Sequence, residues 1–425
     1  MVVWTWFISI AGIMRATHQD VRMSFPAPIS AASPEFKRIN RAMVFGGFST
    51  FALLYCVQPL MPLLARDFGL SAAQSSLALS VATGTLAVSL LASSVLSERY
   101  GRKPLMAGSM FAGGILTLLA AFTHGFGQLL VLRALLGLLL GGMPALAMAY
   151  LSEEIEGPSL GHSMGLYIGG SAFGGMAGRV LSSVISDFFD WRIAVGTMGV
   201  AGLYAAFEFN RSLPDSRRFR QGQGGVRALF KGTAQHMRDA GLPWLFALSF
   251  MLMGAFVSMY NYIGYRLLAP PYLLRQSAVG ALSILYLLGI FSSVWAGKLA
   301  DRLGRRNVLW LMLMAMLAGI LLTLAPQLPL IVIGMGLFTF GFFASHSVAS
   351  SWVGRRARPP QALASALYLF FYYLGSSVVG WMTGVVWGHG AWSGVVAMLG
   401  AILALACAVA LRLRGLAPLQ PAEAR

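Results

Sequence analysis

The sequence predicts an all-α integral membrane protein with twelve transmembrane helices, arranged as two pseudo-symmetric bundles of six. Of its 425 residues, 57% are hydrophobic and only 11% are charged, which is too little charge for the surface of a soluble protein of this size. The apolar residues also recur in runs of about 20 residues, the length that a helix needs to cross a bilayer. These runs are continuous and do not alternate in polarity, which argues against a membrane β-barrel.

The predicted spans divide evenly around one polar segment. We expect them near residues 43–64, 75–96, 105–122, 127–151, 162–185, 191–210, 243–265, 278–298, 308–325, 329–352, 363–386 and 392–412. Residues 211–241 form the only long polar interruption, and they read as a linker between two halves.

A short charged motif occurs twice, each time in a break between two apolar runs. The first copy reads SVLSERYGRKP and the second GKLADRLGRR. Glu98 and Asp301 are 203 positions apart, and Gly101 and Gly304 share that offset. Two copies in register, after the second and the eighth span, indicate a duplicated membrane protein, which is how many secondary transporters are built.

The residue types of this motif suit a tight turn with a charge cluster. Glycine permits a backbone conformation that a side chain would hinder, and the acids can pair with arginine or accept hydrogen bonds at a helix N-terminus. Such a cluster can hold the two halves together in one state and release them in another. Glu153 and Glu154, at the end of the fourth span, can pair with this cluster structurally or take part in gating. The expected gating motifs comprise Glu98, Arg99, Gly101, Arg102, Lys103, Glu153, Glu154, Asp301, Arg302, Gly304, Arg305 and Arg306.

The net charge of +17 orients the chain in a bilayer. If both termini are cytoplasmic, 22 basic residues lie near the inner ends of the spans and four lie in the outer loops. This asymmetry is the positive-inside bias, and it places the basic residues against anionic lipid head groups. We expect no nucleic-acid partner, because no basic face with interleaved aromatic residues occurs outside the loops.

The domain organisation follows from these observations. We expect a poorly ordered N-terminal segment (1–40), a six-helix bundle (41–210), a cytoplasmic linker (211–241), a second six-helix bundle (242–414) and a cytoplasmic tail (415–425). The apolar stretch at the N-terminus is too short to span, and a true start at Met23 accounts for it equally well. Cys56 and Cys407 fall inside spans and are expected to be small buried residues, without a disulfide.

Arg133 and His346 are ionisable residues inside predicted spans, as is Arg179. Placing Arg133 well inside a membrane costs about 2.5–3.5 kcal/mol on insertion scales, so it is either functional or reaches the outer interface with its head group. His346 lies near the middle of the tenth span. Its imidazole either exchanges a proton in the working range or forms a neutral hydrogen bond between helices. The spacing of histidine, cysteine and acidic residues predicts no metal site and no cofactor.

The motifs resemble those of the major facilitator superfamily. The second charged motif is similar to its loop signature, roughly GxLADRxGRK, whereas the first has Ser94 for glycine and Glu98 for aspartate. The segment RALLGLLLG, which starts at Arg133, resembles the second family motif. The segments around Tyr55, Asn261 and His346 resemble the YnfM-type inner membrane transport proteins within that family. The resemblance covers about residues 36–414.

The resemblance implies which helices line a transport path. In this family the first helix of each three-helix repeat lines the pore, here spans one, four, seven and ten. The expected residues of the substrate or proton pathway are therefore Tyr55, Gln58, Arg133, Tyr260, Asn261, His346 and Ser350, with Tyr167 and Tyr372 from spans five and eleven. Each of them can equally form a hydrogen bond between helices.

Glycines in the fifth span are expected to serve helix packing. Gly170, Gly174 and Gly178 recur at four-residue steps, which permits a close helix contact. The family's antiporter signature normally contains Gly-Pro in this span, and that proline is absent here. The absence favours packing over an antiport role for these glycines.

The resemblance implies a secondary active transporter that moves a small organic solute by alternating access across the bacterial inner membrane. We expect proton-coupled efflux, a monomer with both termini cytoplasmic, a proton gradient as driving force, and a small-molecule substrate and bilayer lipids as partners. Uptake of a sugar or metabolite is the alternative within transport, and a non-transporting membrane sensor is the alternative outside it. No acid lies in the first span, whereas Arg133, Arg179 and His346 suit a neutral or anionic solute. An enzyme is not expected, because no pattern of paired acids or of an activated nucleophile occurs.

Overall fold

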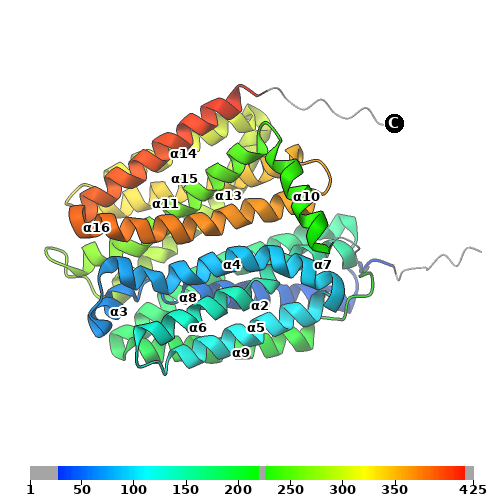
Figure 1. The fold of residues 1–425 in the computed structure, drawn as a ribbon, viewed down its shortest axis with the longest axis horizontal. Coiled ribbons are helices and arrows are strands. Elements are labelled where there is room, and N and C mark those ends of the chain that lie inside the picture. The colour runs from blue at the N-terminus through cyan, green and yellow to red at the C-terminus, as the bar shows by residue number, and fades with distance from the viewer. Residues whose placement is uncertain (1–26, 220–224, 417–425) are drawn as a thin grey trace, which may run out of the picture.

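The computed structural model describes residues 27–219 and 225–416, without the side chain of Glu98. These residues fold into long helices that lie side by side in two groups (Figure 1). Eight helical segments of the described chain are long and apolar enough to cross a membrane, judged by length and composition. The helix order agrees with the predicted all-helical membrane fold.

The N-terminal half occupies the lower part of Figure 1. Its helices are α2 (Pro34–Tyr55), α3 (Met61–Phe68), α4 (Ala72–Tyr100), α5 (Arg102–Ala120), α6 (Phe126–Leu140), α7 (Gly142–Glu154), α8 (Gly157–Phe188) and α9 (Trp191–Ser212).

The C-terminal half occupies the upper part, and α10 (Gly225–Met237) connects the two at the right-hand end. Its elements are α11 (Leu242–Leu268), α12 (Gln276–Ala281), the 3₁₀ helix η1 (Leu282–Leu285), α13 (Tyr286–Leu303), α14 (Arg305–Leu322), α15 (Leu328–Arg356) and α16 (Gln361–Arg414). Two predicted spans are merged in α16, and the chain reverses between them at Ala391, where φ is 44° and ψ is −143°.

Three predicted spans differ from continuous helices. The first starts at Pro34, so the predicted boundary at residue 40 falls inside α2, and it breaks after Tyr55. The fourth is divided into α6 and α7 at Gly141. The eighth begins as the short α12 and a 3₁₀ turn before α13. The predictions for residues 1–26 and 417–425 lie outside the described residues.

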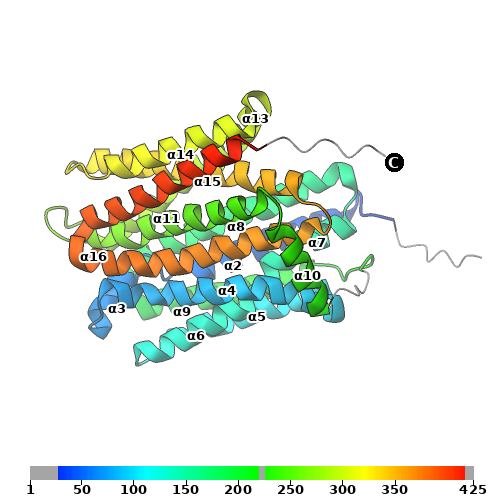
Figure 2. The same cartoon turned by 45° about the horizontal axis from the view of Figure 1, so that its top comes forward.

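The two ends of the bundle contain different structural elements, and we name them the motif end and the distal end. The motif end contains the turns at Gly101 and Gly304 and the linker helix α10, and the distal end contains α3, the 269–275 loop and the reversal at Ala391 (Figures 1 and 2). Gly101 has φ +86° and Gly304 has φ +82°, conformations that L side chains rarely adopt. The glycine in each motif copy therefore permits the sharp turn between two antiparallel helices.

The halves are built on the same helix crossing. A Cβ atom at Gly174 would lie far inside van der Waals contact with the carbonyl oxygen of Phe48, and one at Gly375 would meet that of Phe250 in the same way. Gly170 and Gly178 face the backbone of α2 as well. Backbones approach so closely only where a helix has no side chain, which is how small residues bring membrane helices together.

Candidate substrate pocket and its closure

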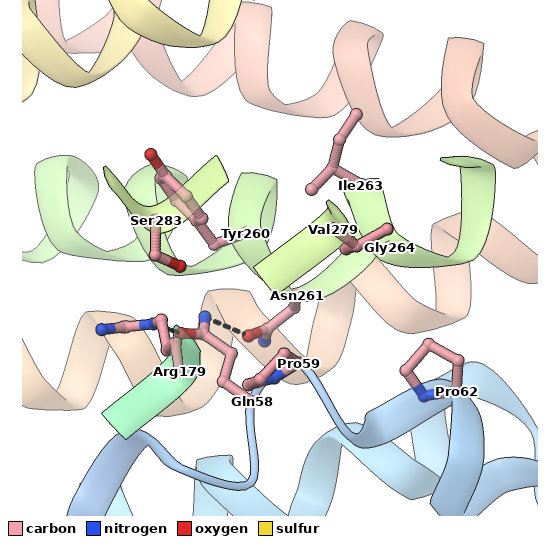
Figure 3. Close-up of a pocket in the computed structure, with 10 residues that line it drawn as sticks. All are labelled: Gln58, Pro59, Pro62, Arg179, Tyr260, Asn261, Ile263, Gly264, Val279 and Ser283. Carbon is pink, nitrogen blue, oxygen red and sulfur yellow. Dashed lines mark hydrogen bonds between the residues drawn. The ribbon is translucent and has the colours of Figure 1, made fainter. Parts of the chain in front are cut away.

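The break in the first span places Gln58 between the two halves. Helix α2 ends at Tyr55, and residues 56–60 are not helical until α3 begins. The side chain of Gln58 then extends toward Asn261 of α11, with Arg179 of α8 on its other side (Figure 3). Pro59 follows directly, and since proline cannot donate a backbone hydrogen bond, it suits the irregular segment.

Three buried polar side chains form a chain of hydrogen bonds across the halves. The Nε2 atom of Gln58 donates to Oδ1 of Asn261 at 2.6 Å and to the carbonyl oxygen of Val257 at 3.3 Å. Its Oε1 atom accepts from Nε of Arg179 at 2.5 Å. The exposed fractions are 1% for Gln58, 1% for Asn261 and 3% for Arg179, so water does not compete for these bonds. We call these three residues the central network.

Gln58 and Asn261 come from different halves of the chain, since Gln58 follows α2 and Asn261 lies in α11. The hydrogen bond between them therefore joins the N-terminal half to the C-terminal half. Around them lies a small pocket, lined by Gln58, Pro59, Pro62, Arg179, Tyr260, Asn261, Ile263, Gly264, Val279 and Ser283 (Figure 3).

Further contacts close the distal end. The carboxylate of Asp187 accepts from the backbone N–H groups of Gln276 at 3.1 Å and Ser277 at 2.8 Å, at the start of α12. The side chain of Gln276 donates to the carbonyl oxygen of Pro59 at 2.5 Å. The hydroxyls of Ser75 and Tyr265 also share a hydrogen bond, at 2.5 Å. In the described chain, every hydrogen bond between residues 41–210 and 242–414 belongs to this distal closure or to the central network.

The charges at the motif end pair within one half. Arg102 pairs with Glu153 at 2.7 Å in the N-terminal half, and Arg305 pairs with Asp301 at 2.9 Å in the C-terminal half. Arg355 lies 3.7 Å from the same Asp301 carboxylate. Among the described residues neither an ion pair nor a hydrogen bond joins residues 41–210 to 242–414 at this end.

The other predicted motif residues contact the linker, the tail or solvent. Lys103 pairs with Asp215 at 3.0 Å, and Glu154 accepts from the backbone N–H groups of Arg217 and Arg218 at 2.7 and 3.0 Å. Arg306 donates to the backbone at the end of α16. Three of the predicted residues remain: Arg99 and Arg302 are exposed, and the side chain of Glu98 lies outside what the structure describes.

Arg133 does not extend to the outer interface. It is 2% exposed, and its guanidinium donates to the carbonyl oxygens of Ala78 at 2.8 Å, Leu53 at 3.1 Å and Leu54 at 2.5 Å. The latter two belong to the last turn of α2, whose carbonyl groups have no intrahelical partner. Arg133 therefore caps the break in the first span, and it is not among the residues that line the pocket of Figure 3.

His346 lies among aromatic side chains in the C-terminal half. Its Nδ1 atom shares a hydrogen bond of 3.0 Å with the hydroxyl of Tyr368, and its ring centroid is 4.7 Å from that of Tyr372. Tyr260 is bonded to Thr339 at 2.9 Å. The Ser350 hydroxyl donates a hydrogen bond to the carbonyl oxygen of Ser347 in its own helix.

Some of the remaining predicted pathway residues lie at the pocket, and others lie in contacts between helices. Tyr55 packs over Arg179, whereas the buried Tyr167 lies where α8 meets α2. Gln58, Tyr260 and Asn261 line the pocket. The structure adds Arg179, which was expected from the sequence to suit a neutral or anionic solute but not as a member of the pathway. It also adds Asp187 and Tyr286, for which no sequence signal stands out.

Two carboxylates outside the spans have a lowered pKa. A hydrogen bond from the Trp191 indole lowers the pKa of Asp67 at the distal end, and Arg192 adds to the effect. At the motif end, burial opposes ionisation of Asp239. Hydrogen bonds from Arg356 and from two backbone N–H groups outweigh that burial and lower the pKa of Asp239.

A duplicated bundle of membrane helices with a buried polar network between its halves is typical of the class of secondary transporters. The chain belongs to the Major Facilitator Superfamily, whose family model matches residues 43–268. It is a multi-pass membrane protein and a transporter of that family.

Comparisons with individual proteins agree with this assignment. The chain is 46% identical to the uncharacterized MFS-type transporter YybF of Bacillus subtilis, over 89% of this chain and 94% of that protein. It is 47% identical to the inner membrane transport protein YnfM of Escherichia coli, over 91% and 92% of the two chains. The structure of a bacterial homologue of the human lysosomal transporter Spinster matches with a TM-score of 0.74 at 14% identity, covering 90% of this chain and 98% of that one. The fold predicted from the sequence is thereby confirmed.

Proposed function

We propose that this transporter exports a small organic solute by alternating access, driven by proton entry. The observation that carries the proposal is the asymmetry of the contacts between the halves. Hydrogen bonds join the halves at the distal end and in the central network, while the described ion pairs of the motif end stay within each half or reach the linker. Such an arrangement corresponds to one of two states that a rocking motion of the halves would exchange.

The proposal includes an orientation. The basic residues gather at the motif end, so by the positive-inside bias this end and both termini face the cytoplasm of a bacterial inner membrane. The relative YnfM is named an inner membrane protein. In this orientation the distal closure seals the pocket from the outside, and solute would enter from the cytoplasm.

His346 is the residue that we propose for proton coupling. Histidine is the side chain whose unperturbed charge change falls between about pH 5 and 8. The imidazole is only half-buried, and it contacts Tyr368 and Tyr372 of α16, so its protonation would change a contact between two helices of the C-terminal half. The first predicted span carries no acid that would serve in its place.

The test uses purified protein in liposomes with an acidic interior and a pH-sensitive dye inside. Candidate organic acids, sugars and amines are added outside in turn, and proton release from the lumen reports exchange. We expect release for one chemical class, its loss in His346→Gln, and no change in His389→Gln, because His389 is exposed near the reversal in α16. Uptake of labelled solute without proton release would replace efflux by a facilitator or uptake mechanism.

A further inference from the structure

We propose that the solute is a small organic anion, with its carboxylate bound by Arg179 and a flat apolar part against the aromatic side chains nearby. The inference rests on the proposed transport function and adds the chemistry of the substrate. Its starting point is the charge of Arg179, which the described structure leaves without an acidic partner.

Arg179 is a buried cation with no ion pair among the described residues. Its Nε atom donates to Gln58, and its Nη1 atom donates to the carbonyl oxygen of Gly175 at 2.6 Å. No hydrogen bond from Nη2 is found within the described chain. Burying an unpaired charge is costly. An anion that accepts a hydrogen bond from the Nη2 atom of Arg179 would therefore be strongly favoured.

Arg133 provides the contrast. It is buried to the same degree, but its Nε, Nη1 and Nη2 atoms all donate to carbonyl oxygens. Its guanidinium therefore has a complete structural role. Arg179 has an incomplete one, at the position where the pocket lies between the halves.

The groups around Arg179 also lack partners. The ring of Tyr55 lies 4.1 Å and that of Tyr286 lies 4.9 Å from the guanidinium carbon. Both tyrosines are 4% exposed, and their hydroxyls are buried without a hydrogen-bond partner within the described chain, as is the Nδ2 atom of Asn261. Hydroxyl and amide groups can donate hydrogen bonds, and carboxylate oxygens accept them. The unsatisfied donors thus match the ligand that the charge favours.

Aromatic side chains continue from this point into the C-terminal half. The ring centroid of Tyr286 lies 5.5 Å from that of Phe343, whose centroid is 5.2 Å from that of Phe342. The rings of His346 and Tyr372 pack against Phe342 and against each other. Phe343, His346 and Tyr372 are half-buried. Such faces bind flat apolar groups by offset or edge-to-face stacking. The ligand would then carry its charge at one end and an aromatic or planar group at the other.

The pocket is too small to hold an organic ligand in this structure. Its free volume of about 10 Å³ suits roughly one water molecule, whereas ligand sites hold about 300–1,000 Å³. A carboxylate that binds Arg179 side-on takes Nε and Nη2 together, and Nε now holds Gln58. Anion binding would therefore displace Gln58 and loosen its bond to Asn261, so the ligand and the closure compete for one guanidinium.

The test measures binding to the purified full-length protein in detergent by thermal shift. The probes are benzoate, phenylacetate and 4-hydroxybenzoate, each beside its carboxamide, together with benzylamine and xylose. We expect at least one acid to bind about tenfold or more tightly than its amide, because a charge-assisted hydrogen bond is lost in the amide. Arg179→Gln should weaken the binding of that acid by a similar factor, and Arg179→Lys by less.

Two further variants keep the test decisive if Arg179→Gln fails to fold. Asn261→Asp places a carboxylate in the pocket that Arg179 also lines, and should weaken binding of the acid by charge repulsion. Tyr286→Phe keeps the ring but removes a donor, and should weaken binding severalfold. Arg192→Gln removes the same charge from the distal surface, where Arg192 pairs with Asp67, and should bind as the wild type does.

The outcomes separate the anion site from the transport proposal. Two binding results would overturn the anion site. One is that no acid binds better than its amide, and the other is that an acid binds to Arg179→Gln and to wild type equally. Proton release driven by xylose or benzylamine would do so as well, while transport would stand. Arg179-dependent binding of an acid that moves no protons in liposomes would support the anion site and refute the coupling.

Discussion

The hydrogen bond between Gln58 and Asn261 should set the balance between the closed and open distal end. Asn261→Leu removes this one bond, because the Nδ2 atom of Asn261 already lacks a partner. We expect a loss of about 0.5–1.5 kcal/mol for the closed state. Gln58→Leu also removes the bond to Val257 and leaves Nε of Arg179 unpaired, so about 2–4 kcal/mol is expected.

The two changes should not add. Once Gln58 is gone, Asn261 has no bond left to lose, so the double variant should resemble Gln58→Leu, with a coupling energy of about 1 kcal/mol. A change of 1.4 kcal/mol shifts the ratio of the two states by about tenfold.

Distances between nitroxide labels can measure this ratio. One label pair joins Phe188 and Leu273 at the distal end, and a second joins Tyr100 and Leu303 at the motif end, all of which are exposed. The distal distance should lengthen and the motif-end distance shorten as the closed state is lost. Strictly additive shifts, or a distal distribution unchanged in Gln58→Leu, would refute a closure that depends on this bond.

Three further predictions concern stability, each read from the midpoint of thermal unfolding in detergent. Gly174→Ala forces a methyl group against the Phe48 carbonyl and should cost about 1–3 kcal/mol, whereas Gly169→Ala, which meets nothing within 4 Å, should change stability by less than about 0.5 kcal/mol. Arg133→Leu leaves the carbonyl groups at the end of α2 without hydrogen-bond donors and should lower the free energy of unfolding by about 2–5 kcal/mol. Asp239→Asn should cost about 1–2 kcal/mol at pH 7; since the folded pKa is lowered, this stabilisation exists above the unfolded value near 3.9 and disappears as pH falls through the folded value.

Each of these has a result that would contradict it. Equal stability of the two glycine variants would mean that the α2–α8 contact can relax. An Arg133→Leu protein as stable as the wild type would show that the carbonyl groups find other donors. A cost of Asp239→Asn that persists unchanged in strong acid would exclude the Arg356 ion pair as its source.

Sequence patterns sufficed for the fold because they report on local physics. A run of apolar residues indicates a membrane helix wherever it occurs, and the glycine of each charged motif predicts a turn, which Gly101 and Gly304 make with positive φ. The break after Tyr55 was beyond such patterns. Its polar backbone is tolerated because Arg133, 79 residues away from Leu54, donates to it.

The pocket could be predicted only in part for the same reason. The helices that line it follow from the repeat, and Gln58, Tyr260 and Asn261 were expected there. The role proposed for Arg179 depends on the acidic partner and the Nη2 hydrogen bond that it lacks within the described chain. This lack can be seen only in the assembled structure. Asp187 gives no local signal either, because the helix start that it caps is 89 residues further along the chain.

The contact of Gln58 with Asn261 has a consequence for how movement passes between the halves. The planar amide of Gln58 uses both of its polar groups, because its oxygen accepts from Arg179 and its nitrogen donates to Asn261. Asn261 uses only its oxygen in this contact, and its Nδ2 atom has no partner within the described chain. A single rigid group therefore connects the buried cation of one half to a helix of the other, so that any displacement at the cation is transmitted across the interface.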